Sequence, residues 1–181
     1  MSSAREKILK TTSVLLEKQG CHATGLNEII RESGSPKGSL YYYFPEGKDQ
    51  IVSESVLQAG QIISERIRLN LSEHGLKDFI LKIAENIEAS NFSSGGPLTA
   101  VAMETATTNE RINLACREAY TMLVSAFQEY FIQKDVVEEK AKKMATFVTA
   151  SIEGGVILSR TNHSADALRV VAEELSNYLE V

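Results

Sequence analysis

No run of apolar residues in the sequence approaches the roughly 20 residues that a membrane-spanning helix needs. The opening residues MSSAREKILK are charged and lack the apolar core of an export signal. The only two cysteines, Cys21 and Cys116, are far apart, and without an export signal such residues are typically free buried thiols rather than a disulfide. We therefore expect a cytosolic protein with no part in a membrane.

Motifs for catalysis and metal binding are lacking as well. The sequence contains no nucleophile elbow, HExxH motif, glycine-rich phosphate loop or CxxC pair. Its three histidines, His22, His74 and His163, are scattered and stand outside any acidic cluster at metal-ligand spacing. These absences predict a protein that is not an enzyme and uses neither a metal ion nor another cofactor.

What the sequence does contain, between residues 26 and 44, is a pattern typical of two short helices joined by a tight turn. Gly34 can adopt the left-handed conformation that ends the first helix. In the Ser35–Pro36 pair that follows, serine is a natural N-cap and proline suits the first helical position. Leu40 and Phe44 are four residues apart, so they share the face that packs on the first helix.

The opposite face of the second helix carries small, hydroxyl-bearing and cationic side chains and no carboxylate. Gly38 permits a close approach of the backbone, and hydroxyl and ammonium groups donate hydrogen bonds to phosphate oxygens or base edges. Lys48 opens the next helix, whose free N–H groups favour an anion. This pattern predicts a DNA-binding surface, although an ordinary helical hairpin with half-buried tyrosines would show the same spacing.

Residues 26–51 resemble the DNA-binding signature of TetR-family transcriptional regulators, and the spacing from Phe44 to Lys48 resembles the LmrA/YxaF branch of that family. The matching segments are Ile29-Ile30, Gly34-Ser35-Pro36, Gly38-Ser39-Leu40-Tyr41-Tyr42-Tyr43-Phe44 and Lys48-Asp49. Gly25 departs from the family, which usually has a capping threonine there, and Thr24 or Asn27 could replace that contact. The resemblance implies DNA contacts by Thr24, Asn27, Ser35, Lys37, Gly38, Ser39, Tyr41, Tyr42 and Lys48.

Helical periodicity continues through the rest of the chain without strand-like alternation, so the sequence predicts an all-α protein. We expect a three-helix helix-turn-helix head at residues 1–47 and a helical ligand-binding and dimerisation body at residues 48–181. Residues 1–50 contain seven basic and six acidic side chains, against 12 basic and 18 acidic in the remainder. The head is therefore near neutral and the body acidic. The segments GGPLTAVAMET and SIEGGVILSRTN also resemble the LmrA/YxaF branch.

The resemblance implies a site for a small-molecule effector between the helices of the body. Aromatic and methionine side chains at helical spacing are equally typical of plain core. Glu104 is a carboxylate in an apolar stretch, where it must be paired or must recognise a ligand. The candidate ligand contacts are Phe92, Met103, Glu104, Tyr120, Phe127 and Phe147.

The two last predicted helices carry a stripe of small and apolar residues, which lets another helix approach closely. Such a stripe favours a four-helix interface between twofold-related copies. The predicted dimer contacts are Ala145, Val148, Thr149, Ile152, Gly155, Val156, Leu168, Val171 and Leu175.

Together, the resemblance implies a homodimeric repressor that places one helix per subunit in successive major grooves of a palindromic operator. A small hydrophobic or aromatic, drug-like effector would release it from the double-stranded DNA, which would connect it with multidrug resistance. The alternative is a helical protein that binds or sequesters a small molecule and has a degenerate DNA-binding head. Gly25 and the near-neutral head favour that alternative.

Overall fold

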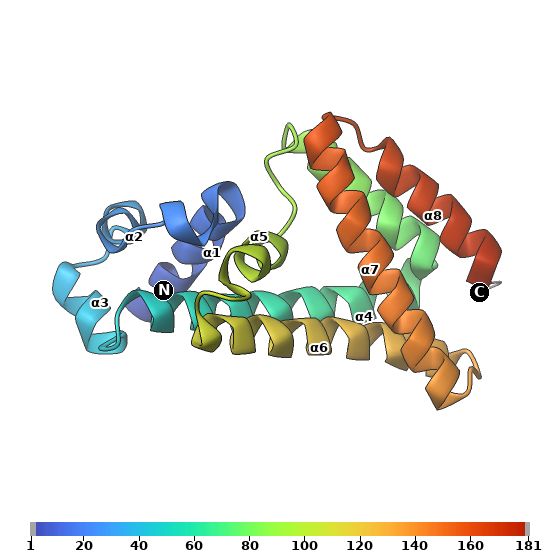
Figure 1. Cartoon of the computed structure of the whole chain (residues 1–181), viewed down its shortest axis with the longest axis horizontal. Coiled ribbons are helices and arrows are strands. Elements are labelled where there is room, and N and C mark those ends of the chain that lie inside the picture. Colours follow the sequence, from blue (N-terminus) through green and yellow to red (C-terminus); the bar gives the residue numbers. More distant parts are fainter. Residues whose placement is uncertain (1–2, 180–181) are drawn as a thin grey trace. The chain divides into compact units, whose positions relative to one another are not determined.

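The computed structural model describes residues 3–179, and these form helices joined by turns, with no strand among them (Figure 1). This confirms the predicted all-α class. None of these helices combines the length and the apolar character that crossing a membrane requires. In chain order they are α1 (Ala4–Ala23), α2 (Leu26–Ser33), α3 (Lys37–Tyr43), α4 (Lys48–Ala89), α5 (Pro97–Thr105), α6 (Glu110–Gln133), α7 (Glu138–Asn162) and α8 (Asp166–Leu179).

The helices belong to two compact units. The first unit contains α1 to α3, α4 as far as Gln61, α5, and α6 as far as Tyr120. The second contains Ile62–Gly95 and the chain from Thr121 onward. The first unit thus includes α5 and parts of α4 and α6 in addition to the predicted head. The functional boundary after residue 47 stays a prediction.

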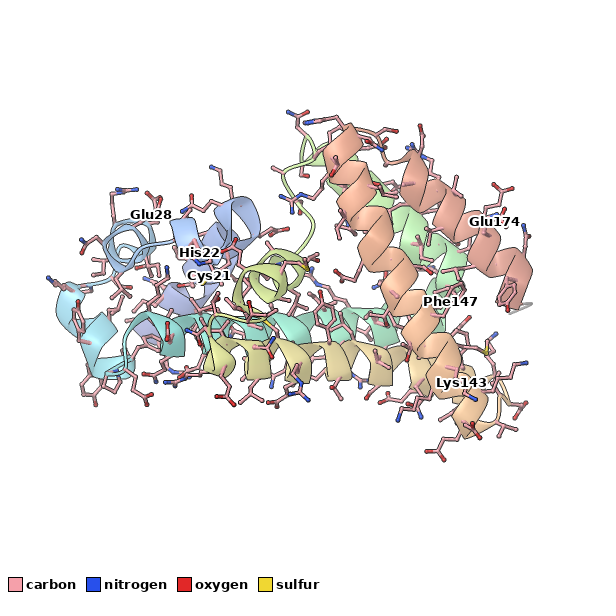
Figure 2. The ribbon with its side chains drawn as sticks, in the orientation of Figure 1. Cys21, His22, Glu28, Lys143, Phe147 and Glu174 are labelled. Carbon is pink, nitrogen blue, oxygen red and sulfur yellow. The ribbon has the colours of Figure 1, made fainter. Side chains whose placement is uncertain are left out.

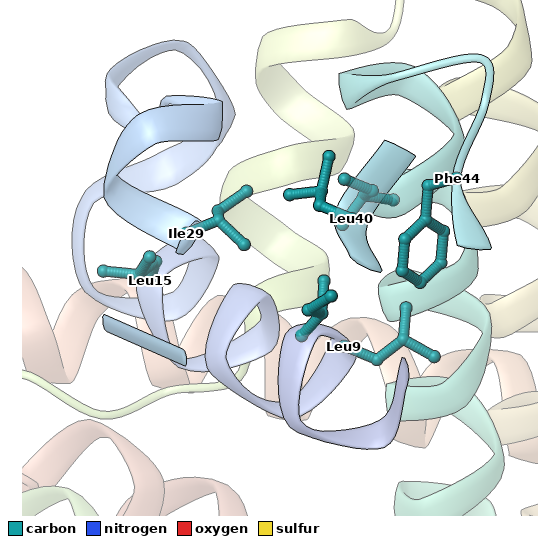
Figure 3. Packing of buried hydrophobic residues seen from close by; sticks show 7 residues of the cluster. Leu9, Leu15, Ile29, Leu40 and Phe44 are labelled. Carbon is teal, nitrogen blue, oxygen red and sulfur yellow. The ribbon is translucent and has the colours of Figure 1, made fainter. Parts of the chain in front are cut away.

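The core of the first unit explains why α2 and α3 fold against α1. Leu40 and Phe44 of the α3 segment are fully buried, as predicted, and so is Ile29 of α2 (Figure 3). They join a cluster with Ile8, Leu9, Leu15 and Ile51. Burial of each such side chain contributes about 1.5–3 kcal/mol, so this cluster holds the three helices together.

Two glycines interrupt long helices. Gly20 in α1 has φ 78° and ψ −179°, and Gly75 in α4 has φ 80° and ψ 177°. Both are conformations that L side chains rarely adopt. A third glycine, Gly60, brings α4 close to α6, because a Cβ there would lie 2.7 Å from the Cβ of Ala119.

In the second unit, packed side chains and ion pairs join distant segments. The Arg68 guanidinium donates to both Glu129 oxygens, at 2.6 and 2.9 Å, and these hydrogen bonds hold the pKa of Glu129 below its ordinary value. The Arg169 guanidinium of α8 donates to Glu88 of α4 at 2.7 Å. These contacts tie α4 to α6 and to α8.

Candidate nucleic-acid interface

The outward face of α3 carries an exposed row of tyrosines. Tyr42 is 79% exposed, Tyr41 45% and Tyr43 36%, whereas Leu40 beneath them is fully buried. The Lys37 ammonium lies 6.0 Å from the centroid of the Tyr41 ring. This helix, KGSLYYY, contains no acidic residue. The face therefore presents hydroxyl groups and a cation, which suit contact with a polyanion.

At Gly38 the backbone of this face is exposed. A Cβ built there has no heavy atom within 4 Å, so the backbone of the first turn of α3 is open to an approaching ligand. Ser39 is half-buried beside it, Asn27 of α2 is exposed, and Lys48 is half-buried at the first position of α4. These four predicted contacts have surface that a ligand could reach.

Two other predicted contacts are buried. The Thr24 hydroxyl donates to the carbonyl of Gly20 at 2.7 Å, and Thr24 is 0% exposed. The Ser35 hydroxyl is buried and has no hydrogen-bond partner among the described residues. Ser35 also does not serve as the expected N-cap of α3, because Pro36 occupies that position without a side-chain cap. Both hydroxyl groups would have to move out of these buried positions before they could contact a phosphate.

Contacts that the sequence did not reveal fix the corner between α3 and α4. Asn109 donates from Nδ2 to Asp49 at 2.8 Å, while its Oδ1 accepts from the N–H of Ile112 at 3.1 Å. Arg111 pairs with Glu46. The start of α6 therefore holds two carboxylates that flank Lys48. Asp49 and Asn109 are 60 residues apart, so no local pattern indicated this contact.

The end of α3 is also supported from α1 and α4. The Arg5 guanidinium lies 5.7 Å from the centroid of the Phe44 ring and pairs with Glu54. Glu54 also accepts a hydrogen bond from Gln50 at 2.8 Å. Cation–π and charge-assisted contacts of this kind orient a helix as well as stabilise it.

The six candidate ligand contacts are divided between the units, with Met103, Glu104 and Tyr120 in the first and the three phenylalanines in the second. Met103 is 78% exposed, and the Glu104 carboxylate lies against α1. Each phenylalanine has its own aromatic neighbour: Phe92 lies 5.4 Å from His163, Phe127 6.0 Å from Phe79 and Phe147 5.9 Å from Tyr178 between ring centroids. A shared effector pocket stays a prediction.

The predicted dimer stripe lies inside the chain. Its α7 members are buried, as are Leu168 and Leu175 of α8. A Cβ at Gly155 would lie 2.8 Å from the Leu168 side chain and 3.5 Å from Val171. The small residues therefore admit α8 of the same chain. The periodicity identified a face that is buried within the chain, and at Gly155 this face packs on α8. A dimer interface at these residues stays a prediction.

A different face of α7 and α8 exposes apolar side chains. Phe147 is 50% exposed and Leu158 53%, and their spacing of eleven positions places both on one side of α7. On α8, Val170 is 57% and Tyr178 77% exposed. Exposed apolar residues gathered on neighbouring helices are typical of an interaction surface.

Both cysteines are free and buried, as the sequence predicted. Burial raises the pKa of each thiol, that of Cys116 to about 11. Neutral, buried thiols are inert. The described residues also contain no group of His, Cys, Asp and Glu side chains that could hold a metal ion.

A short helix exposed on a compact core, entered through a left-handed glycine from a preceding helix, defines a helix-turn-helix protein. Comparison with known sequences agrees. A model described as "Bacterial regulatory proteins, tetR family" matches residues 8–54, and one described as "Transcriptional regulator LmrA/YxaF-like, C-terminal domain" matches residues 73–174. The chain belongs to the TetR family of transcriptional regulators, in its LmrA/YxaF-like branch. As expected from the sequence, this is a family of regulators and not of enzymes.

Two relatives from Bacillus subtilis (strain 168) are similar over nearly the whole chain. The HTH-type transcriptional regulator YxaF is 36% identical over 95% of this chain and 93% of its own length. The HTH-type transcriptional regulator LmrA is 35% identical over 98% of this chain and 97% of its own length. Among solved structures, a regulatory protein TetR from Rhodobacter sphaeroides has a TM-score of 0.84 at 15% identity, covering 97% of this chain and 98% of that one. The last likeness concerns the fold alone.

Proposed function

We propose that this regulator is a cytoplasmic homodimeric repressor that binds a palindromic operator and leaves it when a small hydrophobic or aromatic molecule binds the body. The observation that carries the proposal is the outward face of α3, where Gly38 is open and Tyr41 and Tyr42 are exposed on the same side of the helix. On double-stranded DNA, Lys37, Ser39, Tyr41, Tyr42 and Lys48 would fix the position on phosphates. The first turn around Gly38 would approach the base edges.

Dimerisation would provide the second recognition helix. In a twofold dimer the two α3 helices bind half-sites about 34–36 Å apart, one turn of DNA, and the operator shares the symmetry of the protein. The exposed apolar residues of α7 and α8 support a surface for the second copy. The effector would then favour a dimer with wrongly spaced heads, and DNA would by linkage weaken the effector equally.

We expect Phe147→Glu to weaken the dimer about 30-fold or more, because a buried unpaired carboxylate at an interface costs about 2 kcal/mol or more. Analytical ultracentrifugation over a concentration series measures the effect. The matched control is Val137→Glu, which adds the same charge at a residue that is 75% exposed at the start of α7. A Phe147→Glu protein that dimerises as tightly as the control would place the interface elsewhere.

DNA binding is tested by fluorescence anisotropy of the protein with DNA from immediately upstream of its own gene, with scrambled DNA as the control. We expect tight binding that prefers the native fragment. For a protein that makes six to ten phosphate contacts, raising the salt concentration from 50 to 200 mM should lower the affinity by about 10³- to 10⁵-fold. The reason is that binding releases counterions from the DNA, and added salt opposes their release.

Affinity for the native fragment no better than for scrambled DNA, with a shallow salt dependence, would contradict the repressor. That result would favour the small-molecule-binding or sequestering protein, for which the near-neutral head is the supporting observation. Once DNA binding is established, release of the labelled fragment gives a direct screen for effectors.

A further inference from the structure

The end of α1 is held by a side chain from α5. Gly20 interrupts the helix, so the turn from Cys21 to Ala23 starts anew, and the first amides of a helical turn lack intrahelical partners. The Glu104 carboxylate supplies one, because its Oε2 accepts from the N–H of His22 at 2.7 Å and lies 2.8 Å from His22 Nδ1. Figure 2 marks Cys21 and His22 at this place.

Gly20 and Glu104 fit each other. A Cβ at Gly20 would lie 1.9 Å from Oε1 of Glu104, so the carboxylate occupies the space that a side chain would need. The φ of 78° at Gly20 is also one that glycine adopts most readily. Both the turn and the neighbouring carboxylate therefore require glycine at this position.

A second contact of the same kind joins the other end of α5 to α1. Gly96, the N-cap of α5, donates its backbone N–H to Oε1 of Glu17 at 2.8 Å. Each helix thus contributes a carboxylate that accepts from the backbone near the end of the other. Hydrogen bonds to a charged acceptor are about twice as strong as those between neutral groups, so the pair fixes α5 on α1.

The connector after the kink, residues 20–25, leads directly into α2. The Thr24 hydroxyl bonds back to the carbonyl of Gly20 at 2.7 Å. Gln19 donates to the carbonyl of Ala23 at 3.1 Å and to the Glu28 carboxylate of α2 at 2.7 Å. A continuous set of hydrogen bonds therefore runs from α5 through the connector to the first helix of the DNA-binding pair.

We infer that α5 positions the helix-turn-helix pair, with Glu104 as the positioning residue that fixes the connector and Glu17 as its counterpart. Any change that displaces α5 would remove a partner from His22 and loosen the connector that leads into α2. This inference rests on the proposed DNA binding for its consequence. It gives Glu104 a role within the chain, different from the ligand contact that the sequence suggested.

Hydrogen exchange followed by NMR tests, without DNA, whether Glu104 fixes the connector and α2. In Glu104→Ala we expect the amide of His22 and the first-turn amides of α2 to exchange about tenfold faster, because the connector loses a hydrogen bond to a charged acceptor. Amides in α8 should be unchanged. Glu104→Gln keeps an acceptor oxygen and should restore part of the protection, and Glu118→Ala, which removes an exposed carboxylate of α6, is the control.

The effect of these contacts on DNA binding is measured by fluorescence anisotropy with the native upstream fragment. We expect Glu104→Ala and Glu17→Ala each to lower the affinity about tenfold, and Glu104→Gln and Glu118→Ala to change it less than twofold. Unchanged exchange at His22 and α2 in Glu104→Ala would overturn the inference, and so would faster exchange with unchanged DNA affinity. If the wild-type protein binds no DNA, the proposed function is contradicted. The amide hydrogen exchange would still decide whether Glu104 fixes the connector and α2.

Discussion

Gly38→Glu is expected to lower operator affinity by about 100-fold or more, because like charges brought together at an interface cost several kcal/mol. The new carboxylate would stand on the exposed face of α3, among the groups proposed to meet phosphates and bases. The substitution should not harm the fold. A Cβ at Gly38 meets no atom within 4 Å, and glutamate is a better helix former than glycine by up to about 1 kcal/mol.

Two measurements separate the effect on binding from an effect on folding. Anisotropy gives the affinity, and urea denaturation should give a free energy of unfolding equal to or above that of the wild type. Thr107→Glu adds the same charge at an exposed position after α5 in the same unit and should change affinity less than threefold. Equal affinities for the two variants would show that the face of α3 around Gly38 does not meet DNA.

Phe44→Ala is expected to lower the free energy of unfolding by about 3–5 kcal/mol, the range for removing a buried aromatic ring. The Phe44 side chain is 0% exposed and packs in the cluster with Ile29, Leu40 and Ile51. Its loss would leave a cavity where α3 meets α1 and α4. The head would then open at lower urea concentration, and binding would fall with it.

Tyr42→Ala is the matched control for that change, since it removes an aromatic ring from the same helix at a position 79% exposed. Exposed substitutions typically change stability by about 0.5 kcal/mol or less. Urea titration should therefore separate the two variants clearly. DNA affinity should fall in both, through loss of structure in Phe44→Ala and through loss of a contact in Tyr42→Ala. Equal stabilities for the two would contradict the assigned core.

The helix-turn-helix pair was predictable because its signals are local. The left-handed conformation of Gly34, the burial of Leu40 and Phe44 and the exposure of Tyr42 all follow from glycine's conformational freedom and from the helical repeat. The breaks at Gly20 and Gly75 have the same origin. Thr24 and Ser35 could not be placed in this way, because they lie in the connector and in the turn, where the helical repeat does not indicate which side chains are buried.

The sequence by itself determined the all-α class, the presence of two short helices joined by a turn at Gly34, and which face of each is apolar. Only the tertiary structure decided what covers those faces. The stripe around Gly155 packs on Leu168 of its own chain, α5 lies on α1, and Glu104 accepts from His22. The physical reason is that helical periodicity reports burial along one helix, whereas the partner of a buried face or a carboxylate depends on how distant segments are brought together.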